Sequence, residues 1–497
     1  MKRRSPGPGA ALGAALAAAL VATAPPAAAY DREAAGREGL ALLRELIRID
    51  TSNPPGNELA LLRVAADRLK PAGIEAEIAE TEPGRGVLRA VLPATQKGAA
   101  AARGPILVVA HVDVVGANRT EWTADPFAAE DREGALYGRG AIDDKGMAAA
   151  AITSLVTLSR AGGERSRDLV LILTGDEESG GRLGTAWIVK NRPGWFQRPA
   201  EAINEGGRVL AGDDGRPRWI GLQTTEKISF NLEILAHGKP GHASMPDADN
   251  AILRLGKALA RLEGYRPLPR TTDETKAFFR GLAAVSSPDA AEHLRAIVDL
   301  VQEKVRAGGP ALAPKYETRI VEGPHVSAVS KDRMFSAMLR DTFAPTLLSG
   351  GMRTNVLPAE AKATLNCRIL PDTTPAAFVE ELRRVVDDPA LEWNIVTEPK
   401  APPPASPLQG PLPDAIAAAA KALWPDAPVL PFLSTGATDS ATIRREGIPS
   451  YGLLPFPLSS GDLERMHGAD ERVPHAAYIA GQEFLYRALE EAIRPAP

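Results

Sequence analysis

The sequence predicts an α/β protein in which a domain with a mixed central sheet is interrupted by a smaller α+β domain. Two short, continuous apolar runs, Ile106–Ala110 and Leu169–Leu173, have the composition of buried central strands. Helix-like stretches alternate with these runs, as expected where helices cover both faces of a sheet. After residue 226 this pattern gives way to strands that bracket several helices, which indicates an inserted unit.

Helices are expected in the sequence before and after the first apolar run. Residues 32–49 carry apolar side chains at helical spacing, and residues 58–70 form a helix that Pro71 ends. Residues 146–161 form a third helix, with an alanine-rich packing face. The first part of the larger domain is therefore assigned to residues 30–225.

The inserted unit is assigned to residues 226–399. Residues 227–237 alternate between apolar and polar side chains, as a half-exposed antiparallel strand does. Further strands are expected at 361–369 and 392–397, and helices at 251–262, 273–282, 290–305 and 375–386. Three consecutive prolines at 402–404 mark the linker back to the larger domain, whose second part is 400–497. This second part is expected to hold two helices flanking a strand at 429–433.

Bulk composition excludes several classes of function. With 497 residues, a net charge of −4 and no basic run beyond the extreme N-terminus, the chain is not expected to bind nucleic acid. The single cysteine, Cys367, excludes an internal disulfide and a sulfur-rich metal site. No run of 18 apolar residues provides a stable membrane span.

The first 29 residues are interpreted as a secretory signal peptide. Lys2, Arg3 and Arg4 are followed by an Ala/Leu-rich run and then by a small-residue segment before Tyr30. The alternative is an alanine-rich tail. The signal places the mature chain outside the cytoplasm, in the periplasm of a bacterium or outside the cell.

Five clusters of acidic residues or histidine are the candidates for chemistry, and several directly follow strand-like runs. They are His111 with Asp113, Asp143 with Asp144, the run 176–178, Glu205 before two glycines, and His467 with Asp470 and Glu471. Functional groups of open α/β sheets gather at the carboxyl ends of strands. Each cluster alone also fits a strand end, a capped helix start or a solvated turn. Together, histidines and carboxylates without sulfur suit a two-metal hydrolytic site.

The order of short motifs along the chain resembles the di-zinc metallopeptidase family. The motifs are HVD (111–113), GRGAIDDKG (138–146), DEE (176–178), NEGG (204–207), GHAS (241–244), NVLP (355–358) and MHG (466–468). That family contains glutamate carboxypeptidase, succinyl-diaminopimelate desuccinylase, aminoacylase and the vacuolar Gly-X carboxypeptidase, and the resemblance covers residues 38 to 490. It implies a zinc-bearing α/β domain interrupted by an α+β lid that often dimerises.

The resemblance also implies a role for each motif residue. Asp143 would bridge two Zn²⁺ ions per subunit, with Co²⁺ or Mn²⁺ as alternatives. Glu177 would be the general base, and Asp113 would orient a metal-binding histidine. The further metal ligands would be His111 and Glu205 on one ion, and Glu178 and His467 on the other.

Residues of the lid and of a glycine-rich loop are implied to contact the substrate. His242 would stabilise the oxyanion, often in the site of the partner subunit. Asn355 and Arg368 would bind the substrate, and a guanidinium suits a terminal carboxylate. Gly436 and Thr438 belong to a loop that would help to hold the same carboxylate. The structural alternatives are turn residues, a surface arginine and a plain turn.

The predicted activity is hydrolysis of the amide bond next to a free carboxylate in short peptides, as in a carboxypeptidase or dipeptidase. An aminoacylase acting on N-acyl or N-fatty-acyl amino acids is the alternative, because the acyl side of the pocket cannot be read from the sequence. The long stretch from His242 to Asn355 resembles the larger-lid branch of the family, and it either lines an apolar pocket or only packs. An inactive peptide- or metal-binding relative is the third hypothesis, against which the presence of Glu177 argues. A homodimer through the lid is expected.

Overall fold

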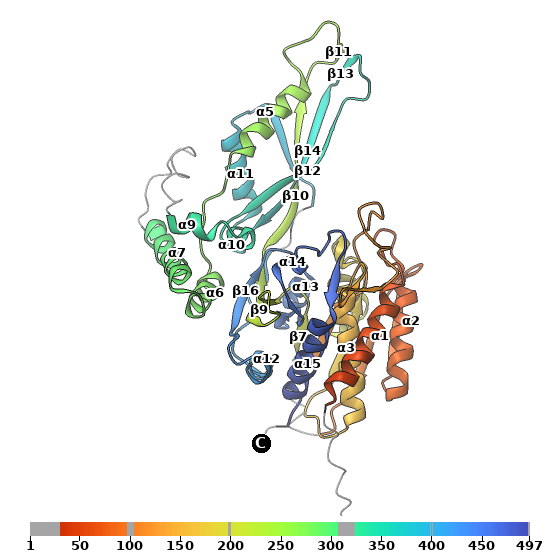
Figure 1. The fold of residues 1–497 in the computed structure, drawn as a ribbon. Coiled ribbons are helices and arrows are strands. Elements are labelled where there is room, and N and C mark those ends of the chain that lie inside the picture. The colour runs from red at the N-terminus through yellow and green to blue at the C-terminus, as the bar shows by residue number, and fades with distance from the viewer. Residues whose placement is uncertain are drawn as a thin grey trace, which may run out of the picture.

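The largest sheet among the described residues is a mixed sheet (Figure 1). The computed structural model describes residues 30–96, 104–196, 200–306, 324–397, 399 and 401–495, and within them ten strands make up this sheet. Their order is β1-β2-β6-β3-β7-β17-β9-β8-β18, and β16 pairs with β9. The strands are β1 (Ala76–Glu82), β2 (Arg85–Leu92), β3 (Ile106–His111), β6 (Leu169–Thr174), β7 (Glu201–Asn204), β8 (Arg208–Ala211), β9 (Pro217–Glu226), β16 (Val429–Ser434), β17 (Ser450–Gly452) and β18 (Pro457–Leu458).

The two predicted central strands, β3 and β6, are confirmed and lie side by side. They run parallel, with His111 opposite Thr174, and every residue of both is buried. A strand buried on both faces needs apolar side chains at consecutive positions, which explains the uninterrupted apolar runs.

Helices cover both faces of this sheet. On one face lie α1 (Arg32–Ile47), α2 (Glu58–Leu69), α3 (Lys145–Ala161), α12 (Pro411–Leu423) and α15 (His475–Ala492), which share one core. On the other face α4 (Thr185–Asn191) and α13 (Asp439–Arg445) pack on alternate residues of the same strands. The predicted mixed α/β fold is therefore confirmed.

The smaller sheet has four strands among the described residues, in the order β12-β14-β10-β15. They are β10 (Ile228–His237), β12 (Thr342–Gly350), β14 (Glu360–Ile369) and β15 (Leu391–Ile395). Helices α5 (Ala251–Glu263) and α11 (Pro375–Val386) pack on it over a separate core. Its edge strand β12 is largely exposed, with Leu347 and Leu348 at 68% and 71% of full exposure.

The long insertion after α5 packs against the larger sheet. It contains α6 (Asp273–Ala284), α7 (Pro288–Arg306), α9 (Pro324–Val329) and α10 (Arg333–Met338). The ring of Phe278 lies 5.2 Å from Trp219 of β9 and 5.9 Å from Phe432 of β16. These aromatic rings form one apolar cluster with Leu430. The insertion thus packs on the sheet, which is one of the two arrangements expected for it.

Lys227 joins the two sheets at the junction between β9 and β10. Its backbone N–H donates to the carbonyl of Ser434 in β16. Its buried ammonium group donates to the carbonyls of Ala337 and Arg340 and to the Thr342 hydroxyl, at 3.2, 2.8 and 2.8 Å. One residue is therefore bonded to the larger sheet through its backbone and to the insertion and β12 through its side chain.

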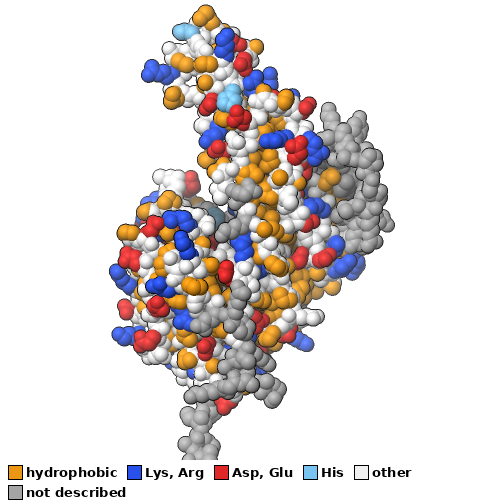
Figure 2. Space-filling view, turned by 180° about the vertical axis from the view of Figure 1, so that it is seen from behind, with side chains coloured by type: hydrophobic (Ala, Val, Ile, Leu, Met, Phe, Trp, Pro, Cys, Tyr) orange, Lys and Arg blue, Asp and Glu red, His pale blue; other side chains and the backbone are white. Residues whose placement is uncertain are grey.

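A narrow arm extends from the smaller sheet. Strand β11 (Gly241–His242) pairs with β13 (Val356–Leu357) at its tip, with His242 opposite Val356. Figure 1 places this pair at the end of the molecule that is farthest from the larger sheet. Figure 2 shows the same arm from behind as a projection with histidine side chains on its surface.

The second part of the larger domain differs from expectation in its helix content. The sequence predicts two helices after residue 414, but four occur in the described residues from Pro411 onward: α12, α13, α14 (Ser460–Leu463) and α15. The two extra helices have four and seven residues, too few for a periodic pattern to be recognised.

Some expectations are not tested by this fold. The division at residues 225/226 and 399/400 stays a prediction, and the expected signal peptide lies outside the described residues. No helix among the described residues is both long and apolar enough to cross a membrane.

Candidate active site

The candidate site lies at the carboxyl ends of three adjacent parallel strands. Strand β3 lies between β6 and β7 and runs parallel to both. His111 ends β3, the acidic run 176–178 follows β6, and Glu205 directly follows β7. Parallel neighbours end at the same edge of a sheet, so segments that are far apart in the sequence meet there.

Asp143 lies between two histidines. Its Oδ1 is 2.9 Å from Nε2 of His111, and its Oδ2 is 3.1 Å from Nε2 of His467. The other ring nitrogen of His111 faces the backbone carbonyl of Asp113 at 3.0 Å. Although burial opposes it, the hydrogen bonds with both histidines hold the pKa of Asp143 below its usual value. The two oxygens of one carboxylate therefore face two different imidazoles.

The three acids after β6 point in different directions. Asp176 has a φ of 67° and directs its carboxylate to the amide of Leu183, 2.9 Å away. Glu178 turns toward His467, whose Nε2 is 3.3 Å from its Oε2. Burial raises the pKa of Glu177 well above its usual value, and the charges of Asp439 and Glu178 act in the same direction.

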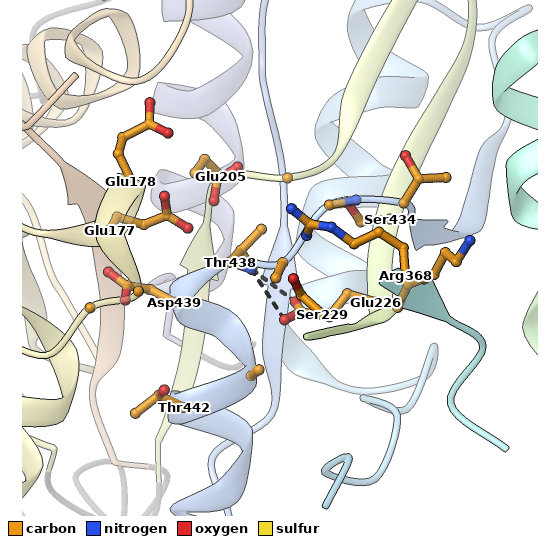
Figure 3. A pocket seen from close by; sticks show the side chains of 18 of the residues that line it. Glu177, Glu178, Glu205, Glu226, Ser229, Arg368, Ser434, Thr438, Asp439 and Thr442 are labelled. Atoms are coloured by element: carbon orange, nitrogen blue, oxygen red, sulfur yellow. Dashed lines mark hydrogen bonds between the residues drawn. The ribbon is translucent and has the colours of Figure 1, made fainter. Parts of the chain in front are cut away.

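The double glycine after Glu205 allows close backbone packing beside the site. A Cβ at Gly207 would lie 2.2 Å from the carbonyl oxygen of Gly452, and Gly206 has a φ of 107°. Only glycine is accommodated at both positions. Burial, together with the charges of Glu177 and Asp143, raises the pKa of Glu205. Figure 3 shows Glu205 beside Glu177 and Glu178.

The donor set fits a divalent cation. Donor atoms of His111, Asp143 and Glu178 lie within 4.8 Å of one another. Oε1 of Glu178 and both carboxylate oxygens of Asp144 are buried without a hydrogen-bond partner. Buried carboxylates without partners are unfavourable unless a cation or proton compensates them. Imidazole and carboxylate groups are ligands that zinc uses in catalytic sites.

A pocket of about 890 Å³ connects these acids to a basic side chain at its other end. Asp143, Glu177, Glu178, Glu205 and His467 line one end, and Arg368 of β14 lines the other. Figure 3 shows the guanidinium of Arg368 pointing from the smaller sheet toward Thr438. No described residue of the insertion between α5 and β12 lines this pocket.

The loop with Gly436 and Thr438 lines the same pocket, but the N–H groups of these two residues already have acceptors. The N–H of Gly436 donates to Oγ of Ser434, and the N–H and hydroxyl of Thr438 donate to the Glu226 carboxylate at 3.2 and 2.9 Å. Figure 3 draws the bonds between Thr438 and Glu226. Glu226 is buried and also paired with Arg444 at 3.0 Å. The carboxylate of Glu226, which was not a candidate residue in the sequence, therefore fixes the position of this loop.

Two expected substrate contacts lie elsewhere in the same chain. His242 and Asn355 are both exposed at the tip of the arm, where the N–H of Ala243 donates to the carbonyl of Asn355. Neither residue lines the pocket. Within one chain, His242 and Asn355 therefore lie near each other, but neither lies near the other candidate residues.

A clamp of Arg139 and Glu471 holds the segment that carries Asp143. The buried carboxylate of Glu471 accepts hydrogen bonds from the amides of Gly140, Ile142 and Asp143 at 2.8 to 3.1 Å. Arg139 pairs with Glu471 at 2.7 Å and donates to the carbonyl of Gly468, next to His467. Both residues belong to motifs or clusters identified in the sequence, but nothing in the sequence indicated that they form an ion pair.

Comparison with known proteins identifies the family. The family model described as peptidase family M20/M25/M40 matches residues 107–491. The N-fatty-acyl-amino acid synthase/hydrolase PM20D1 of Xenopus tropicalis is 29% identical over 399 residues, which cover 78% of this chain and 72% of the relative. Aminoacylase-1 of Mus musculus is 25% identical over 462 residues, covering 92% and 95%.

Solved structures share the fold. The M20 family metallo-carboxypeptidase Sso-CP2 from Sulfolobus solfataricus has a TM-score of 0.63 at 19% identity, covering 92% of this chain and 99% of that chain. Human carnosine dipeptidase 1 has a TM-score of 0.66 at 15% identity, covering 93% and 97%. With a candidate metal site at the strand ends and a family model that spans most of the chain, the protein belongs to peptidase family M20/M25/M40 and is a hydrolase of the metallopeptidase and aminoacylase type.

Proposed function

We propose that the protein hydrolyses the amide bond next to the free carboxylate of a short peptide, as a carboxypeptidase or dipeptidase does. The observation that carries this proposal is the position of Arg368, which faces the acidic cluster across one pocket. Its Nε donates to Asn366, and among the described residues its guanidinium has no ion-pair partner. A planar guanidinium binds a carboxylate through two parallel hydrogen bonds. A substrate held there places its C-terminal amide toward the acids.

The metal ligands are proposed from the arrangement around Asp143. Its two oxygens would serve two Zn²⁺ ions, one also held by His111 and Glu205 and the other by Glu178 and His467. Co²⁺ and Mn²⁺ are alternatives, because such ligands discriminate poorly between these metals. When bound, the metals supply Lewis acidity toward the scissile carbonyl and activate a water molecule.

Glu177 is proposed as the general base, and Asp113 as the residue that orients His111. Burial raises the pKa of Glu177, and its carboxyl group lines the same pocket as the proposed metal ligands, where it would exchange one proton with the attacking water and the substrate. Glu177 accepts this proton from the attacking water and returns it to the departing nitrogen. Asp113 is fully buried, and its Oδ1 lies 3.6 Å from Nδ1 of His111. Gly436 and Thr438 are proposed to contact the substrate near Arg368.

His242 and Asn355 are proposed to act in the pocket of a second copy of the chain, in a homodimer formed through the lid. Two features support this arrangement: the exposed arm that carries both residues, and the exposed edge strand β12 with Leu347 and Leu348. An unpaired strand edge with exposed apolar side chains is a surface that pairs with another chain. His242 would then donate a hydrogen bond to the oxyanion.

Mixing two inactive variants tests this arrangement. After subunit exchange, an equal mixture of His242→Ala and Glu177→Ala should regain about a quarter of wild-type activity. Half of the dimers are then mixed, and each mixed dimer has one complete site. The assay is hydrolysis by each variant alone and by the mixture. A mixture that stays as inactive as its components would show that His242 does not act across subunits.

N-acyl amino acids are the second candidate substrates. Ile142, Leu454, Leu463 and Met466 line the pocket beside Asp143 and His467. Such a wall suits an uncharged, apolar acyl group better than the free ammonium group of a peptide. PM20D1 and aminoacylase-1, whose names refer to acylated amino acids, are among the relatives.

A substrate panel with controlled metal content tests the proposal. The chain from Tyr30 is stripped with a chelator, reloaded with zinc, and assayed on dipeptides and N-acyl amino acids with the same C-terminal residue. Release of that residue should require zinc and disappear when the C-terminal carboxylate is amidated. Arg368→Gln should raise KM by at least 10-fold, because a charge-assisted pair contributes about 1.5–3 kcal/mol. Equal cleavage of amidated and free substrates would contradict the assigned role of Arg368.

Export is also proposed. Residues 1–29 would direct the chain to the periplasm or the cell exterior and be removed before Tyr30.

A further inference from the structure

Asn53 connects two buried carboxylates that flank the candidate site. Its Nδ2 lies 2.9 Å from Oδ2 of Asp113 and 3.1 Å from Oδ1 of Asp176. All three side chains are buried. Ionised carboxylates only accept hydrogen bonds, so the NH₂ end of the amide must face them and each of its protons serves one acid.

The backbone around Asn53 is hydrogen-bonded to the segment that directly follows His111, the last residue of β3. The N–H of Asn53 donates to the carbonyl of Val114 at 2.9 Å, and the Thr51 hydroxyl donates to the carbonyl of Val112 at 2.6 Å. Residues 51–53 therefore run beside residues 112–114, directly after β3. This contact places the Asn53 amide between the segment after β3 and the acidic run after β6.

The two carboxylates hold the reactive segments. Asp113 accepts the backbone N–H groups of Glu177 and Glu178, at 3.1 and 3.3 Å, and also faces His111. Asp176 immediately precedes Glu177. A single amide thus connects the acid behind His111 with the acid that begins the segment 176–178.

The charge balance explains why an amide occupies this position. Arg85 donates to Asp176 at 3.3 Å and to the buried Glu58 at 2.6 Å. The buried carboxylates of Glu58 and Asp176 therefore share one guanidinium, while the third buried carboxylate, that of Asp113, faces His111. Asn53 supplies two further donors without changing the charge, whereas an aspartate there would add a fourth negative group.

We propose that Asn53 is a positioning residue for catalysis, which keeps His111 and the Glu177–Glu178 segment in a fixed relation through Asp113 and Asp176. This inference rests on the proposed roles of those residues. Groups that orient metal ligands contribute about 10- to 100-fold to metal affinity or activity. Loss of the Asn53 amide should therefore affect turnover and metal binding while substrate affinity is retained.

The test uses the full mature chain with Asn53→Ala, Asn53→Ser and Asn53→Asp. At saturating zinc, Asn53→Ala should lower kcat by about 10- to 100-fold with KM within about 2-fold of wild type. Its zinc dissociation constant, measured by competition with a chelating dye, should rise by about 10-fold. Asn53→Ser retains one donor and should fall between Ala and wild type, and Asn53→Asp should have the lowest kcat. Asn191→Ala, which removes an exposed amide bonded to Trp187, is the matched control.

The outcomes separate this inference from the proposed function. If wild type cleaves no member of the substrate panel, the proposed function is wrong, while the zinc titration still tests Asn53. If kcat of the folded variant and its zinc affinity both stay within about 2-fold of wild type, the positioning role is overturned. The same holds if activity declines only in proportion to the loss of folded protein in thermal unfolding. Should Asn53→Ala not fold, Asn53→Ser alone decides, and full activity in that variant refutes the proposal.

Discussion

Replacing Glu177 by Gln should lower kcat by roughly 10²- to 10⁴-fold, the range that positioned general acid–base groups contribute. The substitution keeps the size of the side chain but removes the proton acceptor. The arrangement of His111, Asp143 and Glu178 should survive, because Asp113 holds this segment through the amides of Glu177 and Glu178 rather than through the Glu177 side chain. Steady-state kinetics and metal analysis of the same preparation provide the measurement.

Metal content decides the meaning of this result. A large loss of turnover with unchanged zinc content and KM supports a role of Glu177 in proton transfer. Loss of zinc in parallel with activity would instead make Glu177 a ligand. Glu82→Gln removes an exposed carboxylate paired with Arg182 and should leave activity unchanged. Retention of more than about a tenth of wild-type kcat by Glu177→Gln would refute the assignment of the base.

Arg139→Met should destabilise the protein by about 3–5 kcal/mol, the cost of leaving a buried charge without its partner. Arg139 and Glu471 are both almost fully buried, with 2% and 0% of their surfaces exposed. The guanidinium also donates to the carbonyl of Gly468, so its loss should loosen the segment that carries His467. Denaturant unfolding of the metal-free protein measures the change in free energy without the contribution of metal binding.

Two comparisons identify the cause of that destabilisation. The double variant that combines Arg139→Met with Glu471→Gln should be less destabilised than the sum of the single changes, because no unpaired charge is buried. Arg44→Met removes a guanidinium from a partly exposed pair with Asp131 and should cost no more than about 1 kcal/mol. If Arg139→Met is as mild as Arg44→Met, the clamp does not depend on buried charge.

The strand ends and the motif order could be read from the sequence because both are local features. Apolar runs predicted β3 and β6, and parallel strands end at one edge, so His111 and the acids after β6 were expected to meet. The candidate metal ligands were assigned because these short motifs resemble those of the family, and the resemblance implies a role for each motif residue. In such segments the position of a side chain follows mainly from its neighbours in sequence.

The supporting contacts could not be predicted, since they join residues far apart in the sequence. Glu471 binds amides more than 300 positions earlier, and Asn53 reaches Asp176 across 123 positions. The resemblance implied roles for Glu177 and Glu178 of the acidic run 176–178 but none for Asp176, whose carboxylate, with a backbone φ of 67°, faces the amide of Leu183. Nothing in the local pattern specifies these partners, because they depend on how the whole sheet is assembled.

The hydrogen bonds of Lys227 oppose bending between the two sheets. Such bending would be needed for the arm of one chain to bring His242 into the pocket of the same chain. Bending before this residue breaks its amide bond to Ser434, and bending after it disturbs the three bonds of its ammonium group. A bend before Lys227 therefore loses one neutral hydrogen bond, which contributes about 1 kcal/mol, and a bend after it loses three, so either bend lowers the population of the bent form. In an enzyme whose sites need His242, a separated subunit would therefore be less active than the dimer. Dilution alone would then act as an inhibitor.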